Sequence, residues 1–178
     1  MSAPTQPAFI LFTKGWSPEL LQHPSSPFMH EHEKLLDSKR FEEMRAYYAD
    51  DFVYTKSSGE SFTGISGVDQ MIADYSLFAE HFHEPIYAVI SETEKGYRLI
   101  GHAKLYINLP GAVDKPLTDL SGKKWELAGE GAFIFELVRD PSGPLGFKYT
   151  RTQIFVDPTP ILKVALKRGL IPVEALSG

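Results

Sequence analysis

The hexapeptide EHFHEP, residues 80–85, places two histidines on either side of a phenylalanine. An imidazole with an ordinary pKa of about 6.5 can accept and donate a proton near neutral pH, and it is also a frequent metal ligand. His81 and His83 are therefore candidates for acid/base groups at the mouth of a pocket or for metal ligands. The remaining alternative is polar filler in a loop.

The sequence shows no further ligands at a spacing that would complete a metal site with these two histidines. The His-x-His spacing is similar to the metal pair of a cupin, but a cupin supplies a Glu a few residues later and another His on a following strand, whereas Glu84 is adjacent. The segment HEHE at 30–33 is no stronger a candidate for a metal site, because His30 and His32 would lie about 200° apart on a helix and could not easily bind one ion. We interpret HEHE as solvated helix surface. The chain has no Cys, and we expect neither a metal nor a cofactor.

One further carboxylate and two phenols are candidates for chemistry. Glu130 stands between two glycines in an apolar run, where a bulge or a close ligand approach would turn it towards a cavity. Its alternative is a cross-strand pair with Arg151 on an outer face. Tyr54 could point its phenol into a cavity from a short strand. Tyr106 either donates a hydrogen bond to a substrate oxygen or is an amphipathic residue at an interface.

Composition bounds the class of protein. The 178 residues are 43% hydrophobic and 23% charged, which predicts one globular domain. Twelve Phe, eight Tyr and two Trp can build a core that also lines a cavity. The net charge of −5 without a basic stripe argues against nucleic acid as a partner. We find neither a signal peptide nor a membrane span, and we expect a cytosolic protein.

Helical periodicity dominates the first half of the chain and strand alternation dominates the second. We expect a short strand at AFILF, helices at 25–37, 41–50 and 67–82, short strands at 53–55 and 61–64, four long strands within 85–109 and 125–156, and a helix from Pro160. This order predicts an α+β, cone-shaped single domain with three N-terminal helices packed on a strongly curved antiparallel sheet. We assign residues 1–26 to an N-terminal extension and 27–178 to the domain.

Strand alternation predicts which side chains face a pocket. In WELAGEGAFIFELV, odd positions such as Phe133 and Phe135 face inwards. The opposite face also carries apolar residues, namely Ala128, Ala132, Ile134 and Val138. Apolar residues on both faces favour a homodimer formed through the outer face of the sheet. In GHAKLYINL two sets of side chains alternate, and the pattern does not decide which set faces the pocket. One set contains Ala103 and Leu105, and the other contains His102, Lys104, Tyr106 and Asn108.

The order of these segments resembles a known superfamily. LLDSKRFEEMRAYYADDFVYT followed by FTGISGVDQMI resembles the opening of the nuclear transport factor 2-like superfamily. The strand with Tyr149, Arg151 and Gln153, which runs into Phe155 and Asp157, resembles the ending of SnoaL-like polyketide cyclases. The resemblance covers roughly residues 27–166. It implies an apolar pocket between helices and sheet, and its members include scytalone dehydratase, ketosteroid isomerase, limonene epoxide hydrolase and proteins without catalysis.

The resemblance also implies roles for individual residues. Scytalone dehydratase has an acidic pocket residue in a stretch similar to LLDSKRF, which corresponds to Asp37, and a catalytic histidine in the loop that corresponds to EHFHEP. We favour His83 over His81 because it is next to the predicted strand. The structural alternative for Asp37 is a cap of the second helix. The chain departs from that dehydratase at Phe133 and Phe135, where its pocket Ser and Asn would be expected, so a scytalone substrate is not supported.

We therefore predict a cofactor-independent cyclase, isomerase or dehydratase of natural-product metabolism. It would transfer protons on a hydrophobic oxygenated small molecule through His83 and one of Asp37 or Glu130, with a phenol from Tyr54 or Tyr106. The alternative is a non-catalytic dimeric ligand-binding or scaffold module of the same fold. A pocket filled by its own Phe and Tyr side chains would identify that module, because fold alone does not decide function.

Overall fold

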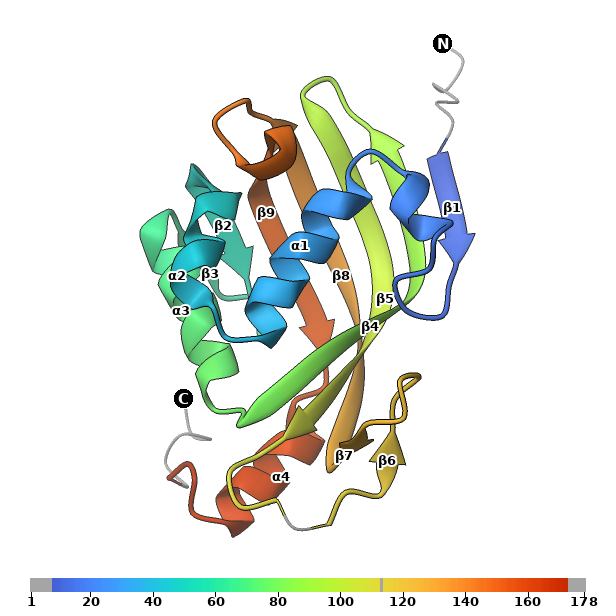
Figure 1. Ribbon diagram of the computed structural model, residues 1–178. Helices are drawn as coiled ribbons and strands as arrows, with labels where there is room; N and C mark the ends of the chain where they lie inside the picture. Colours follow the sequence, from blue (N-terminus) through green and yellow to red (C-terminus); the bar gives the residue numbers. More distant parts are fainter. Residues whose placement is uncertain (1–7, 113, 173–178) are drawn as a thin grey trace.

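The computed structural model describes residues 8–112 and 114–172, and within them four α-helices accompany a seven-stranded sheet (Figure 1). The helices are α1 (Ser26–Asp37), α2 (Phe41–Met44), α3 (Ile65–Ser76) and α4 (Thr159–Lys167). The strands of the large sheet are β1 (Ala8–Phe12), β2 (Tyr48–Thr55), β3 (Ser61–Thr63), β4 (Glu80–Glu92), β5 (Gly96–Asn108), β8 (Leu127–Arg139) and β9 (Phe147–Val156). A separate two-stranded sheet pairs β6 (Leu117–Thr118) with β7 (Lys124–Trp125). The predicted α+β class is confirmed, and the degree of sheet curvature stays a prediction.

The large sheet has the strand order β1-β4-β5-β8-β9-β2-β3 and is mixed. Every neighbouring pair is antiparallel except β2 and β9, which run parallel with Tyr54 opposite Thr152. The expectation of an antiparallel sheet is therefore correct for the other five pairs of neighbouring strands and wrong for the pair β2 and β9. Hairpins fix the directions of the long strands, whereas β2 and β9 are distant in the chain and no short turn constrains their relative direction.

The core lies between α1 and one face of the sheet, with α2 and α3 beside it (Figure 1). Phe28 on α1 is fully buried, and its ring centroid lies 5.0 Å from those of Tyr47 and Tyr149 and 5.9 Å from that of Phe147. Aromatic pairs at these separations contribute both buried area and favourable ring geometry. This cluster fixes α1 on the sheet and thereby fixes the pocket side chains that α1 carries.

The segment EHFHEP belongs to strand β4 and does not form the expected loop. Helix α3 ends at Ser76, six residues before the predicted end, and β4 begins at Glu80. The ladder with β5 starts at the pair Glu80 and Asn108, so pairing with a distant strand extends β4 ahead of Pro85. Phe78 continues the helical period of α3 by chance, and tertiary pairing overrides it. His81 and His83 consequently share one face of a strand.

The second predicted helix is also shorter than expected. Helix α2 ends at Met44, a single 3₁₀ turn covers Arg45–Tyr47, and β2 begins at Tyr48. Tyr48 is buried and pairs in register with Tyr149 of β9, which again favours the extended conformation. The strand at AFILF and the C-terminal helix are confirmed as β1 and α4. Strand β1 pairs with β4, while the proposed boundary after residue 26 stays a prediction. Within the described residues, no helix combines the length and apolar character needed to cross a bilayer.

Candidate functional site

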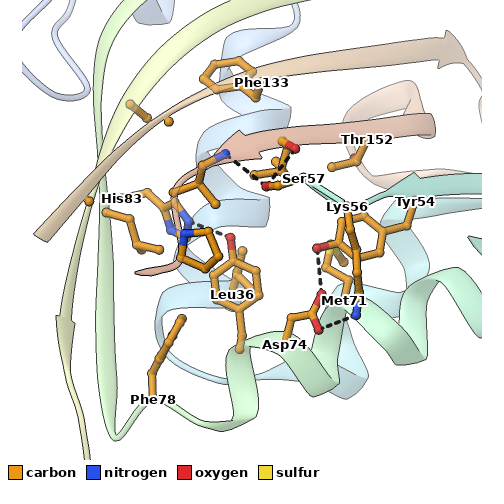
Figure 2. Close-up of a pocket in the computed structure, with 18 of the residues that line it drawn as sticks. Leu36, Tyr54, Lys56, Ser57, Met71, Asp74, Phe78, His83, Phe133 and Thr152 are labelled. Atoms are coloured by element: carbon orange, nitrogen blue, oxygen red, sulfur yellow. Dashed lines mark hydrogen bonds and ion pairs between the residues drawn. The ribbon is translucent and has the colours of Figure 1, made fainter. Parts of the chain in front are cut away.

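A cavity of about 560 Å³ lies between the helices and the inner face of the sheet (Figure 2). This volume is in the range of small-molecule sites. The sheet lines it with Ala103 and Leu105 from β5 and with Gly129, Gly131, Phe133 and Phe135 from β8. The structure thus shows that Ala103 and Leu105 are the side chains of β5 that face the cavity, which the sequence had left open. It also confirms the inward positions of β8. Most of the lining surface is apolar, and polar side chains from several elements lie among the apolar ones.

His83, which lines the cavity, is paired with Asp37, which is not itself part of the lining. Asp37 is the last residue of α1, and its Oδ1 lies 2.7 Å from Nδ1 of His83. The backbone N–H of His83 donates to Oδ2 of Asp37 at 3.2 Å. A carboxylate accepts and does not donate, so the ring proton resides on Nδ1 and leaves Nε2 as the proton acceptor. Both carboxylate oxygens are used to orient one imidazole.

The second nitrogen of His83 contacts a phenol. Nε2 of His83 lies 3.0 Å from the hydroxyl of Tyr75 on α3, and both residues line the cavity. Burial alone would lower the pKa of His83, but the charge and hydrogen bond of Asp37 outweigh it and raise the pKa above its ordinary value. Burial also raises the pKa of Tyr75, so this phenol stays protonated. Asp37, His83 and Tyr75 therefore form a connected chain of proton donors and acceptors.

His81 occupies a different environment from its neighbour. Its side chain is fully buried, and neither ring nitrogen has a hydrogen-bond partner in the described part of the chain. Nε2 lies 3.7 Å from Oδ1 of Asp37, and the ring packs against Tyr75 and Phe78. Burial lowers the pKa of His81 to about 4, with the neighbouring His83 acting in the same direction. His81 is therefore neutral at pH 7. It is also not among the residues that line the cavity.

The structure supplies the third potential metal ligand that the sequence lacked. Asp37, His81 and His83 offer ligand atoms that all lie within 4.8 Å of one another, and three protein ligands are typical of catalytic zinc sites. The statement that the histidines have no third ligand was therefore wrong. Its cause is that Asp37 comes from a helix more than forty residues earlier, which spacing in the sequence does not reveal.

The expectation of a metal-free protein remains a prediction. Asp37 already has both oxygens bonded to His83, and a cation at this place would compete with that hydrogen bond. We expect elemental analysis of protein purified without chelators to find substoichiometric zinc, iron and manganese. One equivalent of any of these metals, lost together with the His83→Ala substitution, would contradict this prediction.

Two residues of the HEHE segment line the cavity, contrary to the interpretation as solvated surface. His32 is buried and forms a hydrogen bond with Tyr48, and burial lowers its pKa to about 3. Glu33 lines the cavity, and its Oε2 accepts a hydrogen bond from Nε1 of Trp16 at 2.8 Å. The signal that could have found Glu33 is its position one helical turn before Asp37, which places both carboxyls on one face of α1.

A second polar group lies on the opposite wall of the cavity from His83 (Figure 2). The hydroxyl of Tyr54 donates to Oδ2 of Asp74 at 2.9 Å, and Lys56 pairs with Oδ1 of Asp74 at 3.1 Å. Tyr54 thus lies at the cavity, as its position in the sequence suggested. Burial raises its pKa, and its proton is engaged with Asp74. The structure brings Tyr54 and His83 to one cavity without direct contact.

The chain resembles known proteins in its fold rather than in its sequence. No protein-family model matches the sequence, and no curated protein sequence matches it significantly. Nuclear transport factor 2 from Cryptosporidium parvum superposes with a TM-score of 0.56 at 11% identity over 83% of this chain and 100% of that chain. The chain has the nuclear transport factor 2-like fold.

Two enzymes with this nuclear transport factor 2-like fold are also similar. A putative scytalone dehydratase from Novosphingobium aromaticivorans DSM 12444 gives a TM-score of 0.59 at 13% identity over 77% of this chain and 84% of that chain. The hexachlorocyclohexane dehydrochlorinase LinA-type3 from Novosphingobium barchaimii LL02 gives a TM-score of 0.55 at 11% identity over 78% of this chain and 84% of that chain. At these identities the likeness establishes the fold, and the resemblance found in the sequence is confirmed at that level.

Within this nuclear transport factor 2-like fold, Tyr106 and Glu130 lie on the sheet face away from the cavity. Tyr106 alternates with the cavity residue Leu105 and packs against Trp125, with its hydroxyl 3.4 Å from Glu84. Glu130 has an exposed side chain, 3.6 Å from Nε2 of His102, and no ion pair with Arg151 is found among the described residues. Strand parity explains both positions, since each residue neighbours one that lines the cavity.

Proposed function

We propose that this chain is a cofactor-independent acid/base enzyme, a cyclase, isomerase or dehydratase that acts on a hydrophobic oxygenated small molecule. His83 and Asp37 are its proton-transfer pair. The names of two similar structures, a scytalone dehydratase and a hexachlorocyclohexane dehydrochlorinase, denote eliminations, reactions that remove a proton together with a leaving group, and they support this class. A role in natural-product metabolism and a cytosolic location are part of the same proposal.

The observation that carries the proposal is the oriented imidazole in an apolar cavity. Asp37 fixes the tautomer of His83 so that Nε2 can accept a proton, and the raised pKa of His83 keeps it near the working range of a general base. A cavity filled by the protein's own aromatic side chains would favour a purely structural or scaffold module. This cavity is not filled in that way, which supports the enzyme proposal. A Glu130 or Tyr106 contribution has no support, because both lie on the other face of the sheet.

The contacts suggest how each group would act. A substrate C–H bond takes the place of the Tyr75 hydroxyl at Nε2 of His83, and the proton moves to that nitrogen. The phenol of Tyr75 is then free to donate a hydrogen bond to a substrate oxygen. Asp37 stabilises the imidazolium that forms. The apolar walls exclude water and strengthen these electrostatic contacts.

A probe reaction tests this proposal without knowledge of the natural substrate. In 5-nitrobenzisoxazole, a base removes the ring C–H proton while the N–O bond breaks, and the nitrophenolate that forms is coloured. We expect the protein to accelerate this reaction above buffer and the acceleration to depend on His83. Acceleration that is absent, or equal in the wild type and His83→Ala, would reject the proposal and favour the ligand-binding module.

We also propose that a second copy of the chain covers the outer face of the sheet. Ile100 and Phe155, 45% and 44% exposed, pair in register with Ile134 and Ala132 on that face. Burial of such a patch favours association. We expect light scattering at micromolar concentration to give the mass of a dimer and Ile134→Asp to give that of a monomer. A monomeric wild type at high micromolar concentration would contradict this expectation.

A further inference from the structure

We propose that Glu33 is a second proton-transfer group of this cavity, an acid that delivers a proton to a departing substrate oxygen while His83 acts as the base. This inference rests on the proposed function and adds a residue with a separate role. It also assigns a task to Trp16, which holds the Glu33 carboxyl in place.

Geometry places the two groups around one reaction space. Glu33 lies one helical turn before Asp37 on α1, so it enters the cavity from the same helix face that orients His83. Oε2 of Glu33 accepts the Trp16 hydrogen bond, and no hydrogen bond to Oε1 is found among the described residues. One oxygen is therefore anchored, while the other is free to carry and donate a proton towards a ligand.

The surroundings of Glu33 favour its protonated form. Burial raises the pKa of Glu33 to about 8; the charge of Asp37 acts in the same direction, whereas His83 and the Trp16 hydrogen bond oppose the shift. The phenols of Tyr75 and Tyr149 line the same cavity. A carboxyl that stays protonated at neutral pH can act as a general acid, which an ordinary surface glutamate cannot.

The two groups divide the work of an elimination. Nε2 of His83 takes a proton from carbon, and the C–H electrons form the new double bond. The C–O bond breaks, and the oxygen leaves with its electron pair and takes the proton of Glu33, so that water is the product. His83 is then protonated and Glu33 ionised, and a proton returned from the imidazolium to the carboxylate restores both groups. No oxidant, metal or cofactor is needed.

Two probes with different leaving groups test this division. The hydroxyl of 4-hydroxy-4-phenylbutan-2-one needs an acid to leave, whereas the nitrophenolate of 5-nitrobenzisoxazole is a good leaving group without one. We expect Glu33→Gln to lower elimination from the hydroxy ketone by roughly 10² to 10⁴ and to lower the ratio of the two rates by at least tenfold. The exposed Glu31→Gln on the same helix is the matched control and should leave both rates unchanged.

The outcomes separate this inference from the proposed function. If His83→Ala abolishes both reactions and Glu33→Gln lowers both equally or neither, Glu33 is not the acid and the base proposal stands. If neither reaction exceeds buffer in the wild type, both proposals fail. Circular dichroism of Glu33→Gln establishes that it is folded, and Glu33→Asp provides a second variant that keeps an acid and should recover part of the hydroxy-ketone rate.

Trp16→Phe tests the positioning role of the indole. It removes the N–H donor to Glu33 and keeps an aromatic ring beside His30. Since that hydrogen bond lowers the pKa of Glu33, its loss should move the alkaline limb of the hydroxy-ketone pH–rate profile to higher pH. An alkaline limb that stays in place in Trp16→Phe and also in Glu33→Gln would overturn the assignment of that limb to Glu33.

Discussion

Replacement of His83 by alanine is expected to lower the rate of 5-nitrobenzisoxazole elimination by roughly 10² to 10⁴, the usual span for losing one acid or base group. The reason is that Nε2 of His83 is the oriented proton acceptor in the cavity, with its tautomer fixed by Asp37. The measurement is kcat/KM from the absorbance of the phenolate. The wild-type rate should rise with pH through the raised pKa of His83, since only the neutral imidazole accepts a proton.

Two variants make this prediction specific. His81→Ala should reduce the rate far less, because His81 is neutral, fully buried and outside the cavity lining. Asp37→Asn removes the charge that raises the pKa of His83, so the rise of rate with pH should move to lower pH and the maximal rate should fall. A larger loss in His81→Ala than in His83→Ala would transfer the role to His81.

The partial success of the sequence at this site has a physical explanation. The segment EHFHEP drew attention because two titratable side chains alternate with a large apolar one, and this alternation is what places His81 and His83 on the inner face of β4. The third helix was expected to continue to residue 82 and to lead into a loop, because the apolar period of α3 continues to Phe78. Only pairing with Asn108 on β5 shows where the helix stops.

The side chains that the sequence did not identify depend on long-range contacts. Tyr75 carries no signal in the sequence that separates it from the apolar residues of α3, since its contact with His83 arises only when α3 packs against β4. Glu33 was assigned to a solvated surface because its cover, Trp16, belongs to the N-terminal segment. For Glu130 the sequence left open an inward turn at its flanking glycines and a place on the outer face; the ladder between β5 and β8 runs without a bulge and leaves it on the outer face.

Replacement of Phe28 by alanine is expected to lower the free energy of unfolding by about 3–5 kcal/mol, the range for removing a large buried aromatic side chain. Phe28 is fully buried among the rings of Tyr47, Phe147 and Tyr149, and the substitution removes its contacts with all three. Urea denaturation followed by circular dichroism gives the change as a lower midpoint at constant slope.

The same substitution should also affect the site, because α1 carries Asp37 at its end and is held on the sheet by this ring. Phe12→Ala is the matched control: its ring is 77% exposed on β1, so we expect a change in unfolding free energy within about 0.5 kcal/mol. In Phe28→Ala, a looser α1 should lower the pKa of His83, seen as a shift of its imidazole resonances in an NMR titration. Equal midpoints for Phe28→Ala and the wild type would show that α1 does not depend on this cluster.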